Sequence, residues 1–420
     1  MHTLLFYEPG HFHAALTLRS HNPRVAADVH VYAHPGPDRE GFLGLVDAFN
    51  SREANPTHWR MRVHAADDPL TRLIEERCGD VVVLAGRNAD KLATIARLHE
   101  AGFNLLADKP WLTSHTALAS LRRATSGPPL VMDIMTERHE ILARLRRRVV
   151  ASPRVFGEFV RDCERPAIEI ASVHHLYKVV NGQPLRRPWW YYDTGIQGDG
   201  LVDIQSHLAD QVQWMVLGDE PGDCDRDIEL HAARRWSTPV PLDLYRQSTG
   251  QPEFPDALSG YVSDGVLALP CNGEIEYSLK GVRIRQRAEW GQREPPGSTD
   301  LHPCVIRGTR CDFLVRHGPE TEYVAKLYLE PVAGVDIEAA LSESIADWQK
   351  DFPGLRLIPA DKGFELVIPD ALRSTHESHF AMVLESFLDY LDAGRWPQWL
   401  TAGIRMRYEL LARSRELALR

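Results

Sequence analysis

The first 135 residues alternate short apolar runs with longer stretches of helical periodicity, and this alternation restricts the fold more than any other feature of the chain. The apolar runs show no strict polar–apolar alternation, as expected for strands that helices cover on both faces. Strands and helices that follow one another in this way build βαβ units around a parallel sheet. We therefore predict a doubly wound α/β domain over residues 1–135.

Loops at the carboxyl ends of such strands surround the ligand-binding crevice, so the bounds of the strands decide where functional residues are sought. The expected strands are Leu4–Tyr7, Val29–Ala33, Met61–His64, Val81–Leu84, Asn104–Ala107 and Leu130–Ile134. The expected helices lie near Phe12–Ser20, Arg39–Asn50, Leu70–Arg77, Lys91–Ala101 and Ser114–Thr125.

The rest of the chain has a different texture, with a polar–apolar alternation that is typical of antiparallel strands. Amphipathic helices near Ser374–Ala393 and Thr401–Leu419 follow these strands. We predict a sheet-rich α/β domain over residues 136–372 and closing helices over residues 373–420. The expected strands are Arg154–Arg161, Glu229–Arg234, Gly260–Leu269, Gly273–Leu279 and Tyr323–Leu329.

Composition and charge weigh against several classes of protein. The 420 residues are too many for one typical core, so two domains are the default expectation. A formal net charge of −10 argues against a nucleic-acid binder, which would normally be basic. The basic run that contains Arg144 and Arg146–Arg148 is expected on the solvated face of a helix.

The lack of a recognisable targeting signal and the use of cysteine both favour the cytoplasm. No apolar run approaches the roughly 20 residues that span a bilayer, and the chain does not open with a secretion-signal pattern. Six cysteines are scattered without a C-x-x-C pair, which fits a reducing compartment. We therefore expect a cytoplasmic protein without a membrane partner.

The turn after the first strand could bind the phosphates of a dinucleotide. Gly10 would let the backbone approach the pyrophosphate, with His11, Phe12 and His13 at the start of the helix. Glu8 replaces the first glycine of the G-x-G-x-x-G pattern, and its acid would disturb a phosphate unless it points away. An ordinary βα turn is the alternative interpretation.

The end of the second strand leaves the choice between NAD and NADP open. A carboxylate is expected there to hold the ribose hydroxyls, but the strand runs into His34. His34 could hydrogen-bond the ribose, or Asp38 or Arg39 could reach it from the next helix.

Asp108, Lys109 and Pro110 follow the fifth strand. This position places Lys109 over the crevice, where it could hold a ribose hydroxyl of the cofactor and the reacting oxygen of the substrate. Its charge would favour the alkoxide that forms as a hydride leaves. A surface lysine in a loop is the alternative interpretation.

Three motifs follow one another along the chain: the turn Gly10–Ala14, the Ala101–Gly102 pair followed by Asp108–Lys109–Pro110, and the stretch Gly198–His207. In this order they resemble the Gfo/Idh/MocA oxidoreductases, the family of glucose–fructose oxidoreductase and inositol dehydrogenase. The tail after Ala333 resembles a branch of oxidoreductases without an assigned substrate.

The resemblance implies a Rossmann domain and an α/β domain with a large, mostly antiparallel open sheet. It also implies NAD or NADP, a sugar-like substrate, and a homodimer or homotetramer formed through that sheet. By position, Lys109, Asp203 and His207 would be the catalytic residues. Asp108 and the loop with Gly86 and Asn88 would bind the cofactor. The departures from the pattern are Glu8 and Asp199 for glycines, Asp108 for glutamate, and Asn88 in a loop that often carries histidine.

Asp203 and His207 are four residues apart, so on a helix they would share one face. His207 could take the hydroxyl proton as a general base, and Asp203 could orient its ring or bind the substrate. A helix start with a buried histidine is the alternative interpretation. No metal-binding motif such as H-E-x-x-H appears, so we expect no metal.

Aromatic and polar residues before the glycine run suit a sugar, whose ring has apolar faces and a hydroxyl rim. The alternative interpretation is that the aromatic residues pack between the domains. The candidate substrate-binding residues are His175, Lys178, Trp190, Tyr192 and Asp193, together with Asp203.

Two further functions compete with a sugar dehydrogenase. In a redox-assisted glycosidase, the bound cofactor oxidises the sugar transiently, without net reduction. In a non-catalytic regulator, cofactor and sugar are only sensed, and the presence of Lys109, Asp203 and His207 argues against this function.

Overall fold

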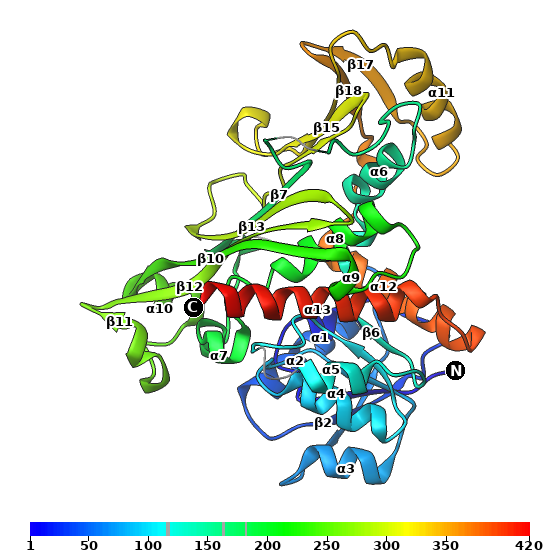
Figure 1. Ribbon diagram of the computed structural model, residues 1–420. Coiled ribbons are helices and arrows are strands. Elements are labelled where there is room, and N and C mark those ends of the chain that lie inside the picture. The colour runs from blue at the N-terminus through cyan, green and yellow to red at the C-terminus, as the bar shows by residue number, and fades with distance from the viewer. Residues whose placement is uncertain (115–117, 162–163, 181–182) are drawn as a thin grey trace.

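The computed structural model describes residues 1–114, 118–161, 164–180 and 183–420. Two sheets form its framework (Figure 1). Residues 4–133 build a six-stranded sheet in the lower part of the view, in blue and cyan. Residues 168–367 build a ten-stranded sheet in the upper part.

The six-stranded sheet is parallel, with the order β3-β2-β1-β4-β5-β6, which confirms the predicted doubly wound fold. The order reverses between β1 and β4, and such sheets bind ligands at the carboxyl ends of the strands beside this reversal. The strands are β1 Leu4–Tyr7, β2 Asp28–Tyr32, β3 Arg60–His64, β4 Val81–Leu84, β5 Asn104–Ala107 and β6 Val131–Asp133.

The helices of this part lie close to their predicted positions. The first is much shorter than predicted, and the predicted start of the fifth includes residues 115–117, outside the described residues. The helices are α1 His13–Leu16, α2 Pro37–Ser51, α3 Pro69–Glu76, α4 Lys91–Glu100 and α5 Leu118–Ala124.

The ten-stranded sheet has the order β10-β12-β13-β7-β14-β15-β16-β18-β17, and β11 pairs with β12. Only β13 and β7 pair in parallel, so the predicted mostly antiparallel sheet is confirmed. The strands are β7 Ile168–Tyr177, β10 Ile228–Pro241, β11 Val262–Ser263, β12 Val266–Leu279, β13 Val282–Arg293, β14 Cys304–Arg307, β15 Cys311–Arg316, β16 Lys326–Pro331, β17 Arg356–Ala360 and β18 Gly363–Val367. A two-stranded hairpin, β8 Val179–Val180 and β9 Gln183–Pro184, follows β7.

Three of the predicted strands are wrong in part or in full, because turns interrupt these segments. Residues 154–161 form no strand, because the chain turns at Gly157, whose φ is +76°. Residues 260–269 are not continuous, because Asp264 and Gly265 have positive φ and form the turn between β11 and β12. Residue 323 also has a positive φ, so β16 begins only at Lys326.

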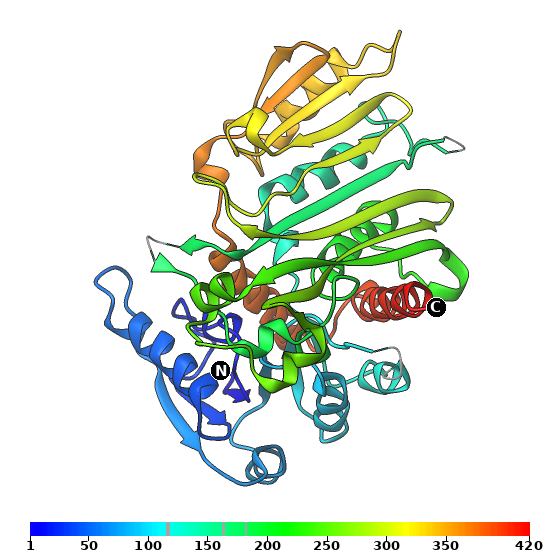
Figure 2. The same ribbon diagram turned by 90° about the vertical axis from the view of Figure 1, so that its left-hand side faces the viewer.

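One face of the large sheet is covered by helices and the other is open (Figure 2). A hollow of about 740 Å³ on this sheet is lined in part by Arg and Glu side chains, among them Glu274 and Arg285. Assembly of copies through this sheet stays a prediction. The covering and connecting helices are α6 Ile141–Val150, α7 Thr194–Gln197, α8 Gln205–Leu217, α9 Cys224–Asp227, α10 Leu242–Thr249 and α11 Glu338–Trp348.

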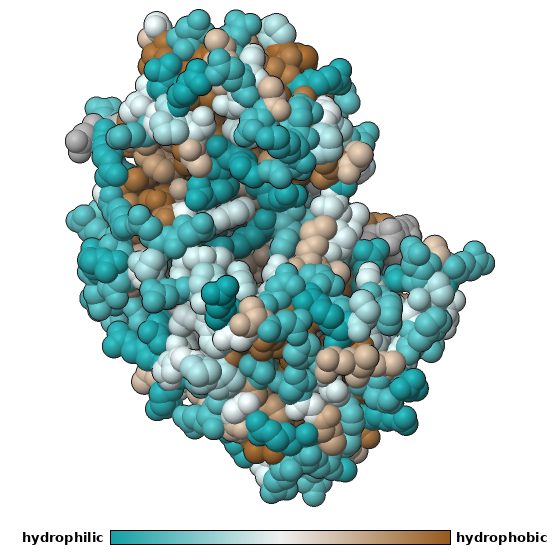
Figure 3. Space-filling view, turned by 90° about the vertical axis from the view of Figure 1, so that its right-hand side faces the viewer, coloured by the Kyte–Doolittle hydropathy of each residue, from teal (hydrophilic) through white to brown (hydrophobic). Residues whose placement is uncertain are grey.

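The two closing helices, α12 His376–Ala393 and α13 Gln398–Ala418, return to the first sheet. The α12 helix packs against α1, and α13 packs against α5 and β6 on one side and α8 and β10 on the other. In Figure 1, α13 runs in red between the two sheets. Figure 3, seen from the side opposite to Figure 2, shows a mainly hydrophilic face with a hollow across its middle.

A buried charge network holds α13 in this position. Arg407 of α13 is 2% exposed and donates to Asp133 at 2.5 Å and to Asp210 at 2.6 Å. Arg138 pairs with the other oxygen of Asp210 at 2.8 Å. Burial alone would raise the pKa of Asp210, but Arg138 and Arg407 hold it below its usual value. The network therefore ties β6, α8 and α13 together.

The prediction that the basic run lies on the solvated face of a helix is only partly correct. Arg146 is 5% exposed and reaches Gln211 of α8, so α6 uses one arginine of the run for internal packing. The described cysteines are free thiols, and Cys163 lies outside the described residues. Among the described residues, no helix is both long and apolar enough to cross a membrane.

Candidate active site

Lys109 and Asp203 meet, although they are 94 positions apart in the chain. Lys109 follows β5, and Asp203 lies in the turn before α8. The Nζ of Lys109 donates to the Oδ1 of Asp203 at 2.8 Å, and the two side chains are only 8% and 6% exposed. Because burial reduces screening by water, this ion pair is a strong electrostatic contact at the edge of the crevice.

His207 lies on the first turn of α8. The sequence predicted Asp203 and His207 on one helical face, but α8 begins only at Gln205, and the carboxylate of Asp203 turns to Lys109. The Nδ1 of His207 is buried and has no hydrogen-bond partner among the described residues. Burial, and then the charge of Lys109, hold the pKa of His207 well below 6.5, so the ring is neutral at pH 7.

Glu8 adopts the backbone conformation that a glycine would take at this turn, with φ at +44°. Its carboxylate accepts hydrogen bonds from the backbone N–H of His34, at 3.0 Å, and from the Nδ1 of the same residue. The acid therefore points toward the end of β2 and not toward the phosphate turn. It lies where dinucleotide-binding folds place the carboxylate for the ribose.

Asp38, in the first turn of α2, lies over the phosphate turn. A Cβ on Gly10 would come within 3.1 Å of the Asp38 Oδ2. That carboxylate accepts from the Nε1 of Trp190 at 3.1 Å and from Arg87 at 3.2 Å. Trp190 is fully buried. Its ring thus serves the contact between the two halves of the chain, the alternative that the sequence left open.

Asp108 does not face the crevice alone, because two histidines of the phosphate turn surround it. The Nδ1 of His13 lies 2.9 Å from its carboxylate, and that of His11 lies 3.4 Å away. The ring of Phe12 packs edge-on against His13. Burial alone would raise the pKa of Asp108, but the two histidines hold it well below its usual value.

Asn88 joins the two halves of the chain. Its Nδ2 donates to the carbonyl of Gln197 at 2.8 Å, and the Nζ of Lys91 bonds to its side-chain oxygen. Gly86 has no room for a side chain, since a Cβ would lie 2.2 Å from the carbonyl oxygen of Glu8. The cofactor roles predicted for Asn88 and Gly86 stay predictions.

The residues predicted to bind substrate fall into two groups. Lys178 pairs with Asp300 at 2.7 Å, and the buried His175 lies within reach of the same carboxylate. Tyr192 bonds to Ser248 and is buried, and Asp193 caps α7 through the backbone N–H of Gly195 at 2.8 Å. Only the first group keeps polar atoms without partners, the Nδ1 of His175 and the Oδ1 of Asp300.

Sequence reasoning missed Glu137 and Asp300. Burial raises the pKa of Glu137 to about 7, to which Glu140 and Asp300 add, while Lys109 lowers it. Lys109 and Asp300 therefore both influence the charge of Glu137, with opposite signs. Glu137 follows the end of β6, the position that marks ligand sites in such sheets, and could have been found by that rule. Asp300 lies between strands and has no such signal.

A nicotinamide dinucleotide fits the two ends of the crevice unequally. At the reacting end, Lys109 and the unpartnered Nδ1 of His207 offer polar contacts. At the phosphate end, the backbone N–H groups of Gly10 and His11 already donate to the carbonyl of residue 85, at 3.2 and 3.1 Å. A pyrophosphate also requires the carboxylate of Asp38 to move away, and its partner Arg87 could then pair with the phosphate.

Among the described residues, side chains that could bind a metal ion come together in three places, although the sequence shows no metal motif. In each group the possible ligand atoms lie within 4.8 Å of one another. They come from separate elements, which explains why residue spacing did not reveal them. The groups are His11, His13 and Asp108; His175, Glu294 and Asp300; and His30, His64 and Cys78.

Two comparisons with known proteins relate the chain to oxidoreductases. A family model described as "Putative oxidoreductase C terminal domain" matches residues 145–419. A crystal structure described as a putative oxidoreductase from Parabacteroides merdae is 38% identical, with a TM-score of 0.96 and coverage of 100% of this chain and 97% of that one. A search of curated proteins finds no match.

More distant structures share the fold. Levoglucosan dehydrogenase in complex with NADH and levoglucosan is 14% identical, with a TM-score of 0.60 and coverage of 99% of this chain and 96% of that one. A putative myo-inositol dehydrogenase from Sinorhizobium meliloti is 13% identical, with a TM-score of 0.54 and coverage of 100% and 98%. With the matched domain over residues 145–419 and the 38% identical structure together, the chain belongs to the oxidoreductase family that carries this C-terminal domain.

Proposed function

We propose that the protein is an NAD-dependent oxidoreductase that moves a hydride between the nicotinamide and a secondary hydroxyl or ketone of a sugar, polyol or sugar derivative. The observation that supports this most is the buried ion pair of Lys109 and Asp203 beside the neutral His207. A cation, a carboxylate and a proton acceptor within one desolvated region are what alcohol oxidation needs.

Each of these residues has a role in the proposal. The nicotinamide, when bound, takes the hydride from the carbon that carries the hydroxyl. Lys109 stabilises the negative charge that grows on the oxygen, and His207 accepts the hydroxyl proton. Asp203 holds the Nζ of Lys109 in place. On the far side of the region, Asp300 offers its unpartnered Oδ1 to other hydroxyl groups of the substrate.

Glu8 supports NAD over NADP. Its carboxylate at the end of β2 could hold the ribose hydroxyls and would repel a 2′-phosphate. We expect Glu8→Gln to raise kcat/KM with NADP relative to NAD by about 10- to 100-fold, since a change of one to three kcal/mol is typical of one charged contact. Steady-state kinetics with both cofactors measures this ratio. An unchanged ratio would show that Glu8 does not face the ribose.

Glu137 is expected to shape the pH profile. With a pKa of about 7, its carboxyl group ionises as the pH rises through neutrality and adds negative charge where the substrate oxygen becomes negative. We expect kcat/KM to fall above about pH 7, and this inflection to disappear in Glu137→Gln. Glu320→Gln, in a short turn far along the chain, is the control. An inflection that survives in Glu137→Gln would assign it to another group.

The direct test of the proposed function is to denature the purified protein, identify any nicotinamide released, and follow NADH formation with a panel of sugars and polyols. Turnover of at least one substrate with stoichiometric NADH supports the proposal. The absence of both bound and bindable nicotinamide would refute it.

The raised pKa of Glu137 favours one second candidate, the redox-assisted glycosidase. A carboxyl group that stays partly protonated at pH 7 could donate a proton to a leaving glycosidic oxygen. A nitrophenyl glycoside distinguishes the two functions. Release of nitrophenol without net NADH would identify the glycosidase, and NADH without nitrophenol would identify the dehydrogenase.

A further inference from the structure

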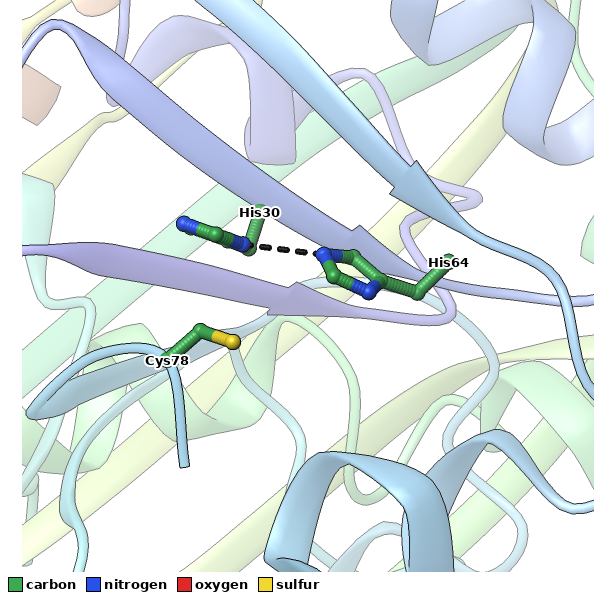
Figure 4. Close-up of side chains that lie close together, drawn as sticks. All are labelled: His30, His64 and Cys78. Atoms are coloured by element: carbon green, nitrogen blue, oxygen red, sulfur yellow. Dashed lines mark hydrogen bonds between the residues drawn. The ribbon is translucent and has the colours of Figure 1, made fainter. Parts of the chain in front are cut away.

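Away from the candidate active site, two histidines and a cysteine gather at the edge of the parallel sheet. His30 lies on β2, His64 lies on the edge strand β3, and Cys78 lies two residues after the end of α3. Figure 4 shows the three side chains together, with a hydrogen bond of 2.9 Å between the Nδ1 of His30 and the Nε2 of His64. All three ligand atoms lie within 4.8 Å of one another.

These distances are near those of a zinc site. Zinc bonds of about 2.0–2.1 Å to nitrogen and 2.3 Å to sulfur put tetrahedral ligand atoms about 3.3–3.6 Å apart. The two nitrogens are slightly closer than this in the structure, and the sulfur lies within 4.8 Å of both. Two imidazoles and a thiolate are also a donor set that zinc prefers over magnesium or calcium.

A carboxylate orients one of the ligands from behind. The Oε2 of Glu76 lies 2.8 Å from the Nδ1 of His64 and also accepts a hydrogen bond from the hydroxyl of Tyr32 at 2.9 Å. This contact places the ring proton of His64 on Nδ1 and leaves the Nε2 lone pair directed at His30. A carboxylate–histidine pair of this kind is the usual support behind a metal-bound imidazole.

The scaffold around the three ligands is rigid. His64 stacks on Tyr32 of the neighbouring strand, with ring centroids 4.3 Å apart. Arg77 ends α3 in a left-handed conformation, and its guanidinium donates to the carbonyls of residues 101 and 102 at 2.7 and 3.0 Å. The backbone before Cys78 is therefore fixed, so binding requires little reorganisation.

We propose that His30, His64 and Cys78 bind one Zn²⁺ ion per chain. The thiol of Cys78 releases its proton to solvent on binding. The ring proton of His30 moves from Nδ1 to Nε2, so that Nδ1 can coordinate the ion. Cys78 is exposed, so a water molecule completes the tetrahedron. The ion links β2, β3 and the end of α3, and none of the residues proposed for hydride transfer takes part.

Cobalt(II) is a suitable probe, because a thiolate bound to Co²⁺ gives a charge-transfer band in the near ultraviolet. The other two groups of possible ligands among the described residues contain no sulfur, and loss of the band in Cys78→Ser assigns it to this site. We expect full-length, metal-stripped protein to develop the band with one equivalent of Co²⁺, and one equivalent of Zn²⁺ to abolish it. Zinc should also raise the melting temperature by several degrees, because it binds only the folded state.

Single variants locate the ion. Cys78→Ser should lose the band, and His64→Ala should weaken binding at least tenfold. The exposed His58→Ala, outside the cluster, should behave like the original protein. Circular dichroism shows whether each variant is folded. Absence of the band in the original protein, or its persistence in Cys78→Ser, would overturn the proposal. Neither result depends on turnover.

Discussion

Replacing Lys109 with methionine is expected to lower kcat/KM for sugar oxidation at least about 1,000-fold, because the positive charge that stabilises the developing alkoxide is lost. The side chain keeps nearly the same volume, so packing changes little. The measurement is NADH formation under steady-state conditions, with the most active substrate from the panel.

Loss of Lys109 also leaves the carboxylate of Asp203 buried without its partner, which by itself destabilises a protein. The double variant Lys109→Met with Asp203→Asn removes both charges and separates the two effects. We expect it to recover much of the melting temperature but none of the activity. If activity returns with stability, Lys109 is structural and not catalytic.

His207→Asn provides an independent check of the same site. We expect a loss of about 10²- to 10⁴-fold in kcat, the range for a general base. The matched control is His99→Asn, which removes a buried imidazole that bonds to a backbone carbonyl at 3.2 Å, outside the candidate active site. Equal activity of the two variants would contradict the role of His207.

Replacing Arg407 with methionine is expected to destabilise the protein by about 3–5 kcal/mol, because it leaves the buried Asp133 without its cation and Asp210 with Arg138 alone. Asp133 and Asp210 are 3% and 1% exposed, so water cannot replace the lost contacts. The free energy of unfolding from urea titration measures the effect. Because α13 packs against both sheets, the loss should appear in both halves of the chain.

Arg420→Met is the matched control for this prediction. Arg420 pairs with Glu416 at the exposed end of the chain, and such surface pairs contribute little to stability. We expect no more than about 0.5 kcal/mol. A similar loss in both variants would mean that the buried network does not hold the two sheets together.

The parallel sheet could be predicted almost completely, because its strands are continuous apolar runs and each run has one place in a βαβ unit. The second sheet could be predicted only in outline. Positive φ angles at Asp264 and Tyr323 interrupt segments that alternate like strands. Alternation reports which faces are buried but not where the backbone turns, so these ends were misplaced.

The residues of the candidate site were predicted more accurately than their contacts. Lys109 and Asp203 meet as expected, but Asp203 belongs to a turn and bonds to Lys109 instead of orienting His207. Glu8 departs from the family pattern in residue type and keeps the backbone conformation of the glycine. Which partner a side chain chooses depends on long-range packing, which spacing along the chain does not contain.

The sequence by itself determined the parallel sheet, the crevice at the ends of its strands, and the lysine beside it, because periodicity and strand order are local properties. Only the tertiary structure decided that Lys109 and Asp300 both influence the charge of Glu137, that Arg407 joins β6 to α8, and that His30, His64 and Cys78 gather at one edge. Each of these sets joins residues from separate elements. Their chemistry depends on distances and burial that arise only when those elements pack.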